Sequence, residues 1–230
     1  MNTQLVKIDT SPDLVDQVYR SLLDAISDGS MAPGARIGQE DIARQLAVSR
    51  QPVLQALRLL KKDGFVLDAP GRGVLVAPLD ADWLMQIYQV RCALDALAAR
   101  LAAGKRQVID PRLIAQGRAA TKSGKVKPMI SADMAFHAAI YAASGNAMIA
   151  QSAQMHWQHI RRAMGAVLQV SKVRDAVWDE HEAIAQAIAQ GDEARAERLI
   201  RQHGEDASRN LAVLLANTLQ PNAPAQAKSA

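Results

Sequence analysis

Four residues in the C-terminal part of the sequence have types and spacing that suit a metal site. Asp133 and His137 are four residues apart, so on a helix both lie on the face that also carries Ile140. His181 and His203 each stand in register with apolar residues of their own segments. A buried carboxylate without a partner is costly, and three imidazoles that converge on it suit a divalent cation.

Each histidine also has a separate explanation, because a histidine on an apolar helix face is usually a hydrogen-bonded core residue. Four such groups on three predicted helices favour a shared site but leave this alternative open. His156 and His159 lack an apolar register of that quality, and we expect them at the surface or at the rim of a pocket. The single cysteine, Cys92, excludes an intrachain disulfide, and we expect it to be a small core residue.

Catalytic zinc sites also have three histidines and an open coordination position. A metalloenzyme is therefore the main alternative from another functional class. The sequence shows no general base beside the four residues and no nucleophile motif. We therefore expect a binding protein and not an enzyme.

A second set of polar residues suits the major groove of DNA. A predicted helix exposes Ser49, Arg50, Gln51, Leu54, Gln55, Arg58 and Lys62. Arginine can form two hydrogen bonds with guanine, glutamine can pair with adenine, and leucine can contact a thymine methyl. A solvated helix face can have the same composition, but a preceding helix, a tight turn and a following hairpin favour DNA binding here.

The positive charge supports this interpretation only locally. The pI is about 9.4, but residues 1–78 contain nine cations and nine anions. From Arg36 to Pro78, seven cations stand against four anions. Within that segment, Lys61, Lys62 and Arg72 are best placed to contact phosphates, which position a protein on DNA without specifying sequence.

To reach DNA, the predicted DNA-contacting residues must be positioned by a helix-turn-helix followed by a hairpin. The sequence of residues 1–78 has that pattern. The predicted elements are a helix from Ser11 to Gly29, a strand at Arg36-Ile37, a helix that buries Ile42 and Leu46, a turn at Ala47-Val48, a helix capped by Ser49 and ended by Gly64, and strands at Phe65-Val66-Leu67 and Val74-Leu75-Val76. We therefore predict a winged helix-turn-helix domain.

The rest of the chain has helical periods only. The predicted helices cover residues 82–103, a short segment from Asp110, residues 131–143, 146 to about 170, 174–190 and 192–217. The expected fold is mainly α, with a winged helix-turn-helix in residues 1–78, an all-α six-helix bundle in residues 79–220 and a flexible tail in residues 221–230.

The N-terminal segment contains a long fixed pattern. It reads Pro33-Gly34-x-Arg36-Ile37, then Asp41-Ile42-Ala43-x-x-Leu46-x-Val48-Ser49-Arg50-x-Pro52-Val53-x-x-Ala56-Leu57-x-x-Leu60-x-x-x-Gly64-Phe65-Val66, then Gly71-Arg72-Gly73. This pattern closely resembles the GntR family of transcription regulators. The resemblance implies a homodimer on a short inverted repeat of double-stranded DNA, with Arg50 at a base, Arg36 at the DNA surface and Gly71 in the wing.

The chain departs from that family at Leu54, where an arginine is usual, so the operator sequence cannot be inferred from those of relatives. Gly38, Ala47 and Gln51 are milder departures from the usual Ser, Gly and Thr.

The C-terminal part resembles the FCD-type ligand-binding domain of one GntR branch. The resemblance rests on Asp133-x-x-x-His137, on Asp179-Glu180-His181 and on His203. It implies that Asp133, His137, His181 and His203 hold a divalent metal, often zinc or nickel, in a helical bundle that receives small carboxylates.

Arg91, near Asp95, and Asn146 are then expected partners of the effector. Six helices suggest the smaller variant of that domain.

We therefore expect a transcription regulator whose operator affinity responds to a carboxylate metabolite. The resemblance implies a repressor, because release from DNA on ligand binding is common in that family. A ligand-independent DNA-binding protein with a structural metal is the alternative. The sequence has no run of about eighteen apolar residues and no signal-peptide pattern, so we expect a cytoplasmic protein with no membrane partner.

Overall fold

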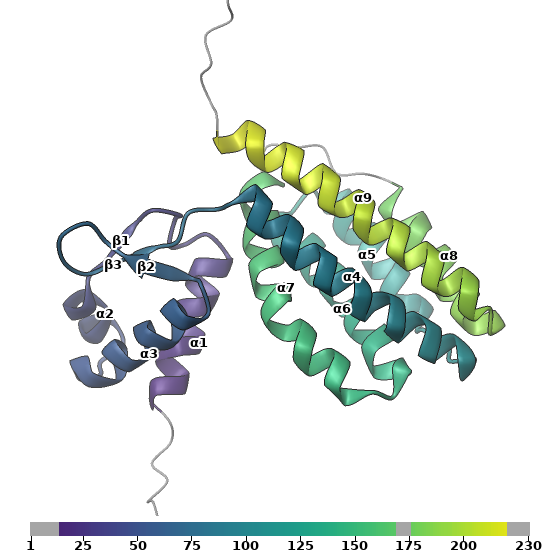
Figure 1. The fold of residues 1–230 in the computed structure, drawn as a ribbon, viewed down its shortest axis with the longest axis horizontal. Coiled ribbons are helices and arrows are strands. Elements are labelled where there is room, and N and C mark those ends of the chain that lie inside the picture. The colour runs from purple at the N-terminus through teal and green to yellow at the C-terminus, as the bar shows by residue number, and fades with distance from the viewer. Residues whose placement is uncertain (1–13, 169–175, 220–230) are drawn as a thin grey trace, which may run out of the picture. The chain divides into compact units, whose positions relative to one another are not determined.

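The computed structural model describes residues 14–168 and 176–219, which form nine helices and three short strands (Figure 1). The described residues divide into two compact units, one made mainly of residues up to Pro78 and the other mainly of residues from Leu79 onwards. The predicted helix start at Ser11-Pro12, the predicted start at Arg174 and the predicted flexible tail lie outside the described residues. The mainly α fold is confirmed.

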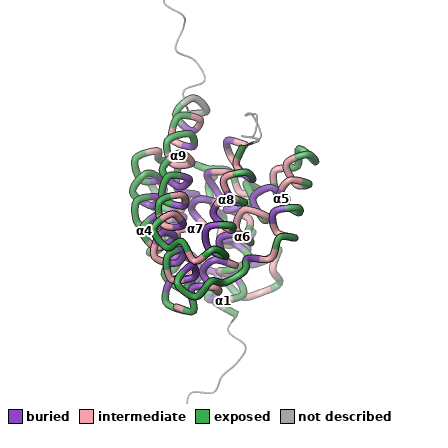
Figure 2. The backbone as a smooth tube through the Cα atoms, turned by 90° about the vertical axis from the view of Figure 1, so that its right-hand side faces the viewer, coloured by how far each residue is buried: buried purple, intermediate pink, exposed green. Residues whose placement is uncertain are grey.

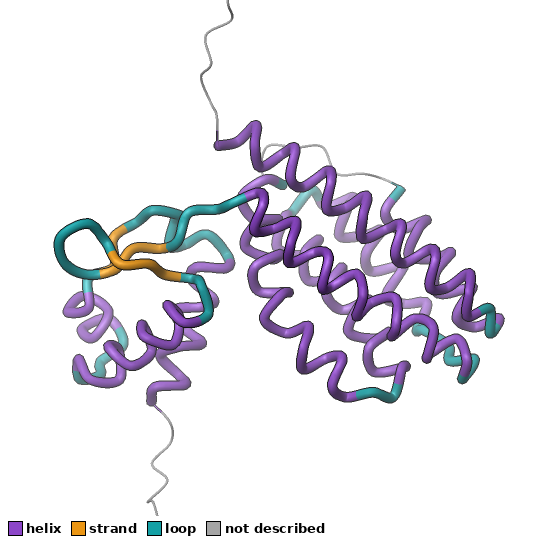
Figure 3. The backbone as a smooth tube through the Cα atoms, viewed as in Figure 1, coloured by secondary structure: helices purple, strands orange, loops and turns teal. Residues whose placement is uncertain are grey.

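The first unit is a three-helix domain with a small antiparallel sheet (Figure 3). Its elements are α1 (Leu14–Ser27), β1 (Arg36–Ile37), α2 (Gln39–Gln45), α3 (Arg50–Lys62), β2 (Val66–Asp68) and β3 (Val74–Val76). Strand β3 is central, and its Leu75 pairs with Arg36 on one side and Leu67 on the other. This is the predicted winged helix-turn-helix, with β2 and β3 as the wing.

Buried side chains of α3 and two left-handed backbone segments shape this unit. Val53 and Leu60, on the inner face of α3, are fully buried and fix which side of the helix faces out. The turn before α3 places Ala47 in the left-handed region, at φ 51°. The tip of the wing has φ 89° at Gly71 and 90° at Gly73, a conformation that residues with a Cβ rarely adopt.

The second unit consists of six helices in the described residues. They are α4 (Ala81–Gly104), α5 (Pro111–Ser123), α6 (Val126–Ser144), α7 (Ala147–Val167), α8 (Val177–Gln190) and α9 (Glu193–Leu219). The predicted number of helices is confirmed. Helix α6 begins five residues before the predicted Ser131, because Pro128 lies in its first turn, where a backbone N–H needs no partner within the helix.

The six helices enclose one core, and buried positions lie along the inner sides of the helices (Figure 2). Helix α4 buries several alanines, which let neighbouring helices approach closely, and α9 lies along it (Figure 1). The same core also buries charged and polar groups, among them Arg91, Asp95 and His137. None of the described helices has the length and apolar character needed to span a membrane.

Candidate metal centre and nucleic-acid interface

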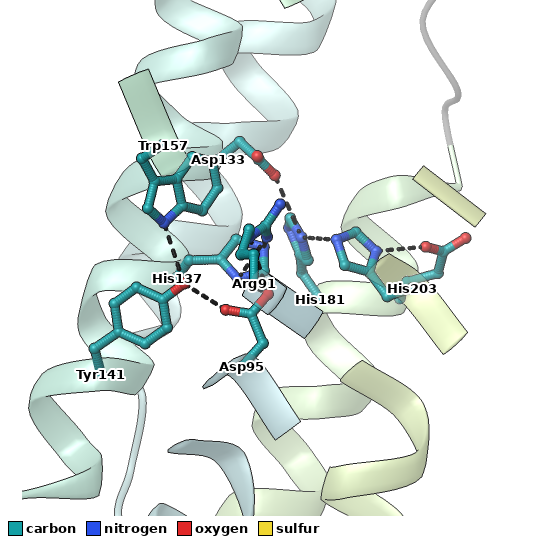
Figure 4. Close-up of polar contacts among 9 residues, drawn as sticks. Arg91, Asp95, Asp133, His137, Tyr141, Trp157, His181 and His203 are labelled. Carbon is teal, nitrogen blue, oxygen red and sulfur yellow. Dashed lines mark hydrogen bonds and ion pairs between the residues drawn. The ribbon is translucent and has the colours of Figure 1, made fainter. Parts of the chain in front are cut away.

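The bundle brings the four predicted metal ligands together. Asp133 and His137 come from α6, His181 from α8 and His203 from α9 (Figure 4). One ligand atom from each residue lies within 4.8 Å of the others. We call these four residues the metal cluster.

The spacing of the donor atoms fits one divalent ion. The Nε2 atom of His181 lies 3.2 Å from Nε2 of His203 and 3.5 Å from Oδ1 of Asp133. Ligands about 2.1 Å from a tetrahedral metal are about 3.4 Å from one another. The three histidines are buried, whereas Asp133 is partly exposed. The cluster therefore offers four suitable ligands and an approach on the Asp133 side.

The surroundings keep the imidazoles neutral. Burial lowers the pKa of His181 well below its usual value, and the nearby His203 and His137 lower it further. Burial and the positive charge of Arg91 lower the pKa of His137. Neutral imidazole is the form that binds a metal, so the cluster is ready for an ion without first losing protons from these two rings.

Carboxylates outside the cluster orient two of the imidazoles. Nδ1 of His203 lies 2.8 Å from Oε2 of Glu180, and Nδ1 of His137 lies 3.6 Å from Oδ2 of Asp95. The carboxylate of Glu180 at Nδ1 fixes the tautomer of His203 and leaves its Nε2 to bind a metal, whereas Nε2 of His137 lies 2.9 Å from Nη2 of Arg91. Sequence reasoning did not assign Glu180 a role, although it directly precedes His181, because successive helix residues point in different directions.

Arg91 is buried and paired within the protein. Its Nε lies 3.0 Å from Oδ2 of Asp95, its Nη2 lies 2.9 Å from Nε2 of His137, and its guanidinium carbon lies 4.0 Å from the centre of the Trp157 ring. Tyr141 donates a hydrogen bond to Asp95 and accepts one from Nε1 of Trp157 at 3.1 Å. Although burial alone would raise the pKa of Asp95, Arg91 and the other neighbours hold it below its usual range.

A cavity of about 380 Å³ adjoins the metal cluster. Asp133 belongs to its wall, and residues of all six helices contribute the rest, including Tyr88, Met129, Met164 and Trp178. Arg91 is not among the residues that line it. In this structure Arg91 orients His137 and Asp95, and the cavity wall is mostly apolar.

The remaining predicted effector residue lies elsewhere. Asn146 occupies the N-cap of α7, where its Oδ1 accepts a hydrogen bond from the backbone N–H of Met148 at 3.1 Å, and it does not line the cavity. His156 is half-buried, and His159 is buried with its ring centre 6.2 Å from that of Trp83. We expected both residues at the surface or at the rim of a pocket, but His159 is buried, and neither histidine belongs to the metal cluster. Cys92 is buried, as predicted.

The outer face of α3 presents the predicted DNA-reading residues. Arg50, Gln51, Gln55, Arg58 and Lys62 are exposed, and Leu54 between them is half-buried. Arg50 forms an ion pair with Glu40 at 2.8 Å, and both side chains are about 70% exposed. Ser49 occupies the N-cap position as predicted, but its side chain makes no capping hydrogen bond.

The side chain of Arg36 forms hydrogen bonds with the backbone of the wing. Its Nη1 donates to the carbonyl oxygen of Arg72 at 3.2 Å, and its Nη2 donates to that of Pro70 at 2.9 Å. The side chain of Arg72 is exposed next to Gly71 at the tip. The structure thus gives Arg36 a role in positioning the wing, which the sequence did not indicate.

Two family models match the chain. The model described as "Bacterial regulatory proteins, gntR family" matches residues 14–76, and the model described as "FCD domain" matches residues 86–206. The first match contains α3 and the wing, and the second contains all four residues of the metal cluster.

Several transcription regulators are similar in sequence. The chain is 35% identical over 95 residues to the HTH-type transcriptional regulator YdhC of Bacillus subtilis (strain 168), which covers 41% of this chain and 42% of that protein. It is 28% identical over 193 residues to an HTH-type transcriptional regulator in an unstable DNA locus of Streptomyces ambofaciens, covering 81% of this chain and 80% of that protein. The match to YdhC thus spans less than half of its length.

Solved structures have the same fold. McbR/YncC of E. coli matches with a TM-score of 0.72 at 22% identity, over 93% of this chain and 100% of that one. A transcriptional regulator GntR from Rhodococcus sp. RHA1 matches with a TM-score of 0.71 at 24% identity, over 86% and 96% of the two chains. At these identities the likeness extends to the fold alone.

Proposed function

Because the chain belongs to the GntR family of bacterial regulatory proteins and carries an FCD domain, we propose that it binds an inverted-repeat operator with an affinity set by a small carboxylate at the metal cluster. Family membership makes it a DNA-binding transcription regulator of the GntR/FCD type, and not an enzyme. The residue contacts, the metal, the carboxylate and the direction of control are what we propose.

On the DNA side, we propose that α3 lies in the major groove. Arg50 would bond a guanine and Leu54 would contact a thymine methyl, while Lys62 and Arg72 would contact phosphates. Before Arg50 can contact a base, its ion pair with Glu40 must break. That ion pair is exposed and therefore contributes little, on the order of 1 kcal/mol or less.

On the ligand side, we propose that Asp133, His137, His181 and His203 hold one zinc or nickel ion. A divalent ion there supplies the positive charge that attracts a carboxylate. Within the chain, Glu180 holds His203 so that its Nε2 faces the cluster. The wall of the cavity excludes water from the body of the ligand.

The observation that carries this proposal is the position of Asp133. It belongs both to the metal cluster and to the wall of the 380 Å³ cavity. A ligand in the cavity can therefore reach an ion in the cluster. If that ligand favours one arrangement of the regulator, linkage requires it to change operator affinity by the corresponding factor. Release of a repressor on binding is the proposed direction.

Metal analysis combined with DNA binding tests the proposal. We expect about one divalent metal per purified chain, lower occupancy in His181→Ala and His203→Ala, and normal occupancy in His156→Ala, a matched control outside the cluster. Operator is obtained by selection from random duplexes. Folded cluster variants should bind it but lose the response to carboxylates, whereas a wild-type protein that responds to none would support a purely structural metal.

An inverted repeat is read by two copies of a domain related by two-fold symmetry. We therefore propose a homodimer. Light scattering should give about twice the chain mass of 24.8 kDa in solution and on operator DNA. A monomer that saturates one operator with a single copy would contradict this part of the proposal.

A further inference from the structure

The cavity beside the metal cluster suits one class of carboxylate. We infer that the effector is a monocarboxylate with an apolar body, and not a polycarboxylate or a sugar acid. This inference rests on the proposed function, because it assigns the chemistry of the ligand to the same site.

The charges at the cavity favour a single carboxylate. Asp133 is the only acidic or basic residue among the described lining residues, and burial raises the pKa of Tyr88 and keeps it neutral. With neutral imidazoles, a divalent ion and Asp133 together carry one net positive charge. One carboxylate balances it. A second would lie against the wall without a cation, because Arg91 is paired with Asp95 outside the cavity.

The wall offers few hydrogen bonds to hydroxyl groups. Met129, Met164 and Leu211 are apolar, and Nε1 of Trp178 donates to Oγ1 of Thr121 at 3.1 Å, so this pair is already engaged. The other polar groups of the wall are the hydroxyl of Tyr88 and the amide of Asn210, which is at an exposed position. A sugar acid would bury more hydroxyls than these two groups can bond, and each hydroxyl left without a partner costs free energy. An apolar chain gains from the same wall, and methionine side chains adapt to its shape.

The volume sets the size of the ligand. At about 30 Å³ for each water-sized group, a cavity of about 380 Å³ holds roughly a dozen such groups. A body of roughly six to ten carbons fits this space, whereas acetate would leave most of it to water.

Titration calorimetry on the zinc-loaded full chain tests the inference with butanoate, hexanoate, octanoate and adipate, the dicarboxylate as long as hexanoate. We expect Kd to fall about fourfold for each added methylene, the factor that corresponds to about 0.8 kcal/mol. Adipate should bind about 100-fold more weakly than hexanoate. Adipate binding as tightly as hexanoate would overturn the inference. Chelation of the zinc should abolish binding of all four acids, and hexanoate binding that survives it would also overturn the inference.

A substitution at the rim of the cavity tests whether the ligand binds there. Val213 lines it, is 61% exposed and can be changed with little risk to folding. Val213→Lys should strengthen adipate binding about two- to fivefold and leave hexanoate unchanged, as expected of an exposed ion pair. Val108→Lys, at a 76% exposed position outside this cavity, should change neither. Equal effects of the two variants would overturn the inference.

The outcomes separate this inference from the proposed function. If polycarboxylates bind more tightly than hexanoate and release the operator, the inference fails and the proposed function stands. If no carboxylate binds the zinc-loaded protein, both fail.

Discussion

Replacing Glu180 should weaken metal binding without altering the four ligands. Its Oε2 accepts a hydrogen bond from Nδ1 of His203 at 2.8 Å, the distance expected for a bond to a charged carboxylate. Partners of this kind typically contribute 10- to 100-fold to metal affinity, or about 1.4 to 2.7 kcal/mol. The side chain of Glu180 is 29% exposed, so water weakens the interaction and the effect should lie in the lower part of that range.

We therefore expect a loss of about tenfold in zinc affinity for Glu180→Gln, which keeps an acceptor but not the charge, and about 30-fold for Glu180→Ala. Competition with a chromophoric zinc chelator at neutral pH measures both values. The matched control is Glu182→Gln, on the same helix, whose carboxylate pairs with Arg118 at 2.8 Å and does not contact the cluster.

Unchanged zinc affinity in Glu180→Ala would refute the assignment of this carboxylate. An equal loss in Glu182→Gln would show that the effect comes from the charge of α8 and not from the bond to His203. Melting temperatures in the presence of chelator should be nearly the same for all three variants, which excludes a general loss of folding as the cause.

Four further outcomes follow from the geometry. Arg50→Ala should weaken specific operator binding by about 1 to 3 kcal/mol in a gel-shift titration, whereas Arg20→Ala, which removes an exposed arginine of α1, should have little effect. Leu54→Arg should change the preferred base at one symmetric position of each half-site in a randomised-operator selection, and identical preferences would mean that Leu54 does not face the groove. Ala47→Gly should stabilise the protein by up to about 1 kcal/mol in urea unfolding, because it relieves a left-handed conformation at an exposed residue. Because burial lowers the pKa of His181, the unfolded chain takes up a proton below about pH 6.5 that the folded chain does not. This residue should therefore cost metal-free protein up to about 1.4 kcal/mol of stability per pH unit there, and His137, whose pKa is also lowered, should add to the loss, so His181→Gln should reduce the dependence in chelator without abolishing it.

The order of elements follows from local sequence signals. Gly124, Gly145 and Gly191 end α5, α6 and α8, and the runs around Val66 and Leu75 are short, apolar and separated by a glycine-rich turn. The start of α6 could not be placed in the same way. Pro128 indicates an interruption when the sequence is read alone, but the first turn of a helix accepts proline.

The metal cluster was predictable because its determinants lie within single helices. The spacing of Asp133 and His137 places both on one face, and the apolar registers of His181 and His203 point each toward a core. The groups around the cluster depend instead on which helices cross. Glu180 meets His203 only because α8 and α9 pack together, and Arg91 lies over Trp157 only because α4 and α7 do.

The ligands and the cavity wall determine different properties of the site. In the proposed function, four ligands with one negative charge would allow a carboxylate to bind at an ion held there, whatever the rest of that carboxylate is. The wall, to which residues such as Met129, Met164 and Trp178 contribute from three different helices, determines which carboxylate fits. Substitutions in the wall would then change the proposed effector while the four residues of the metal cluster stay the same. If the proposed site is correct, a relative with the same four residues would be a guide to the metal, whereas the effector would have to be inferred from the cavity of each protein.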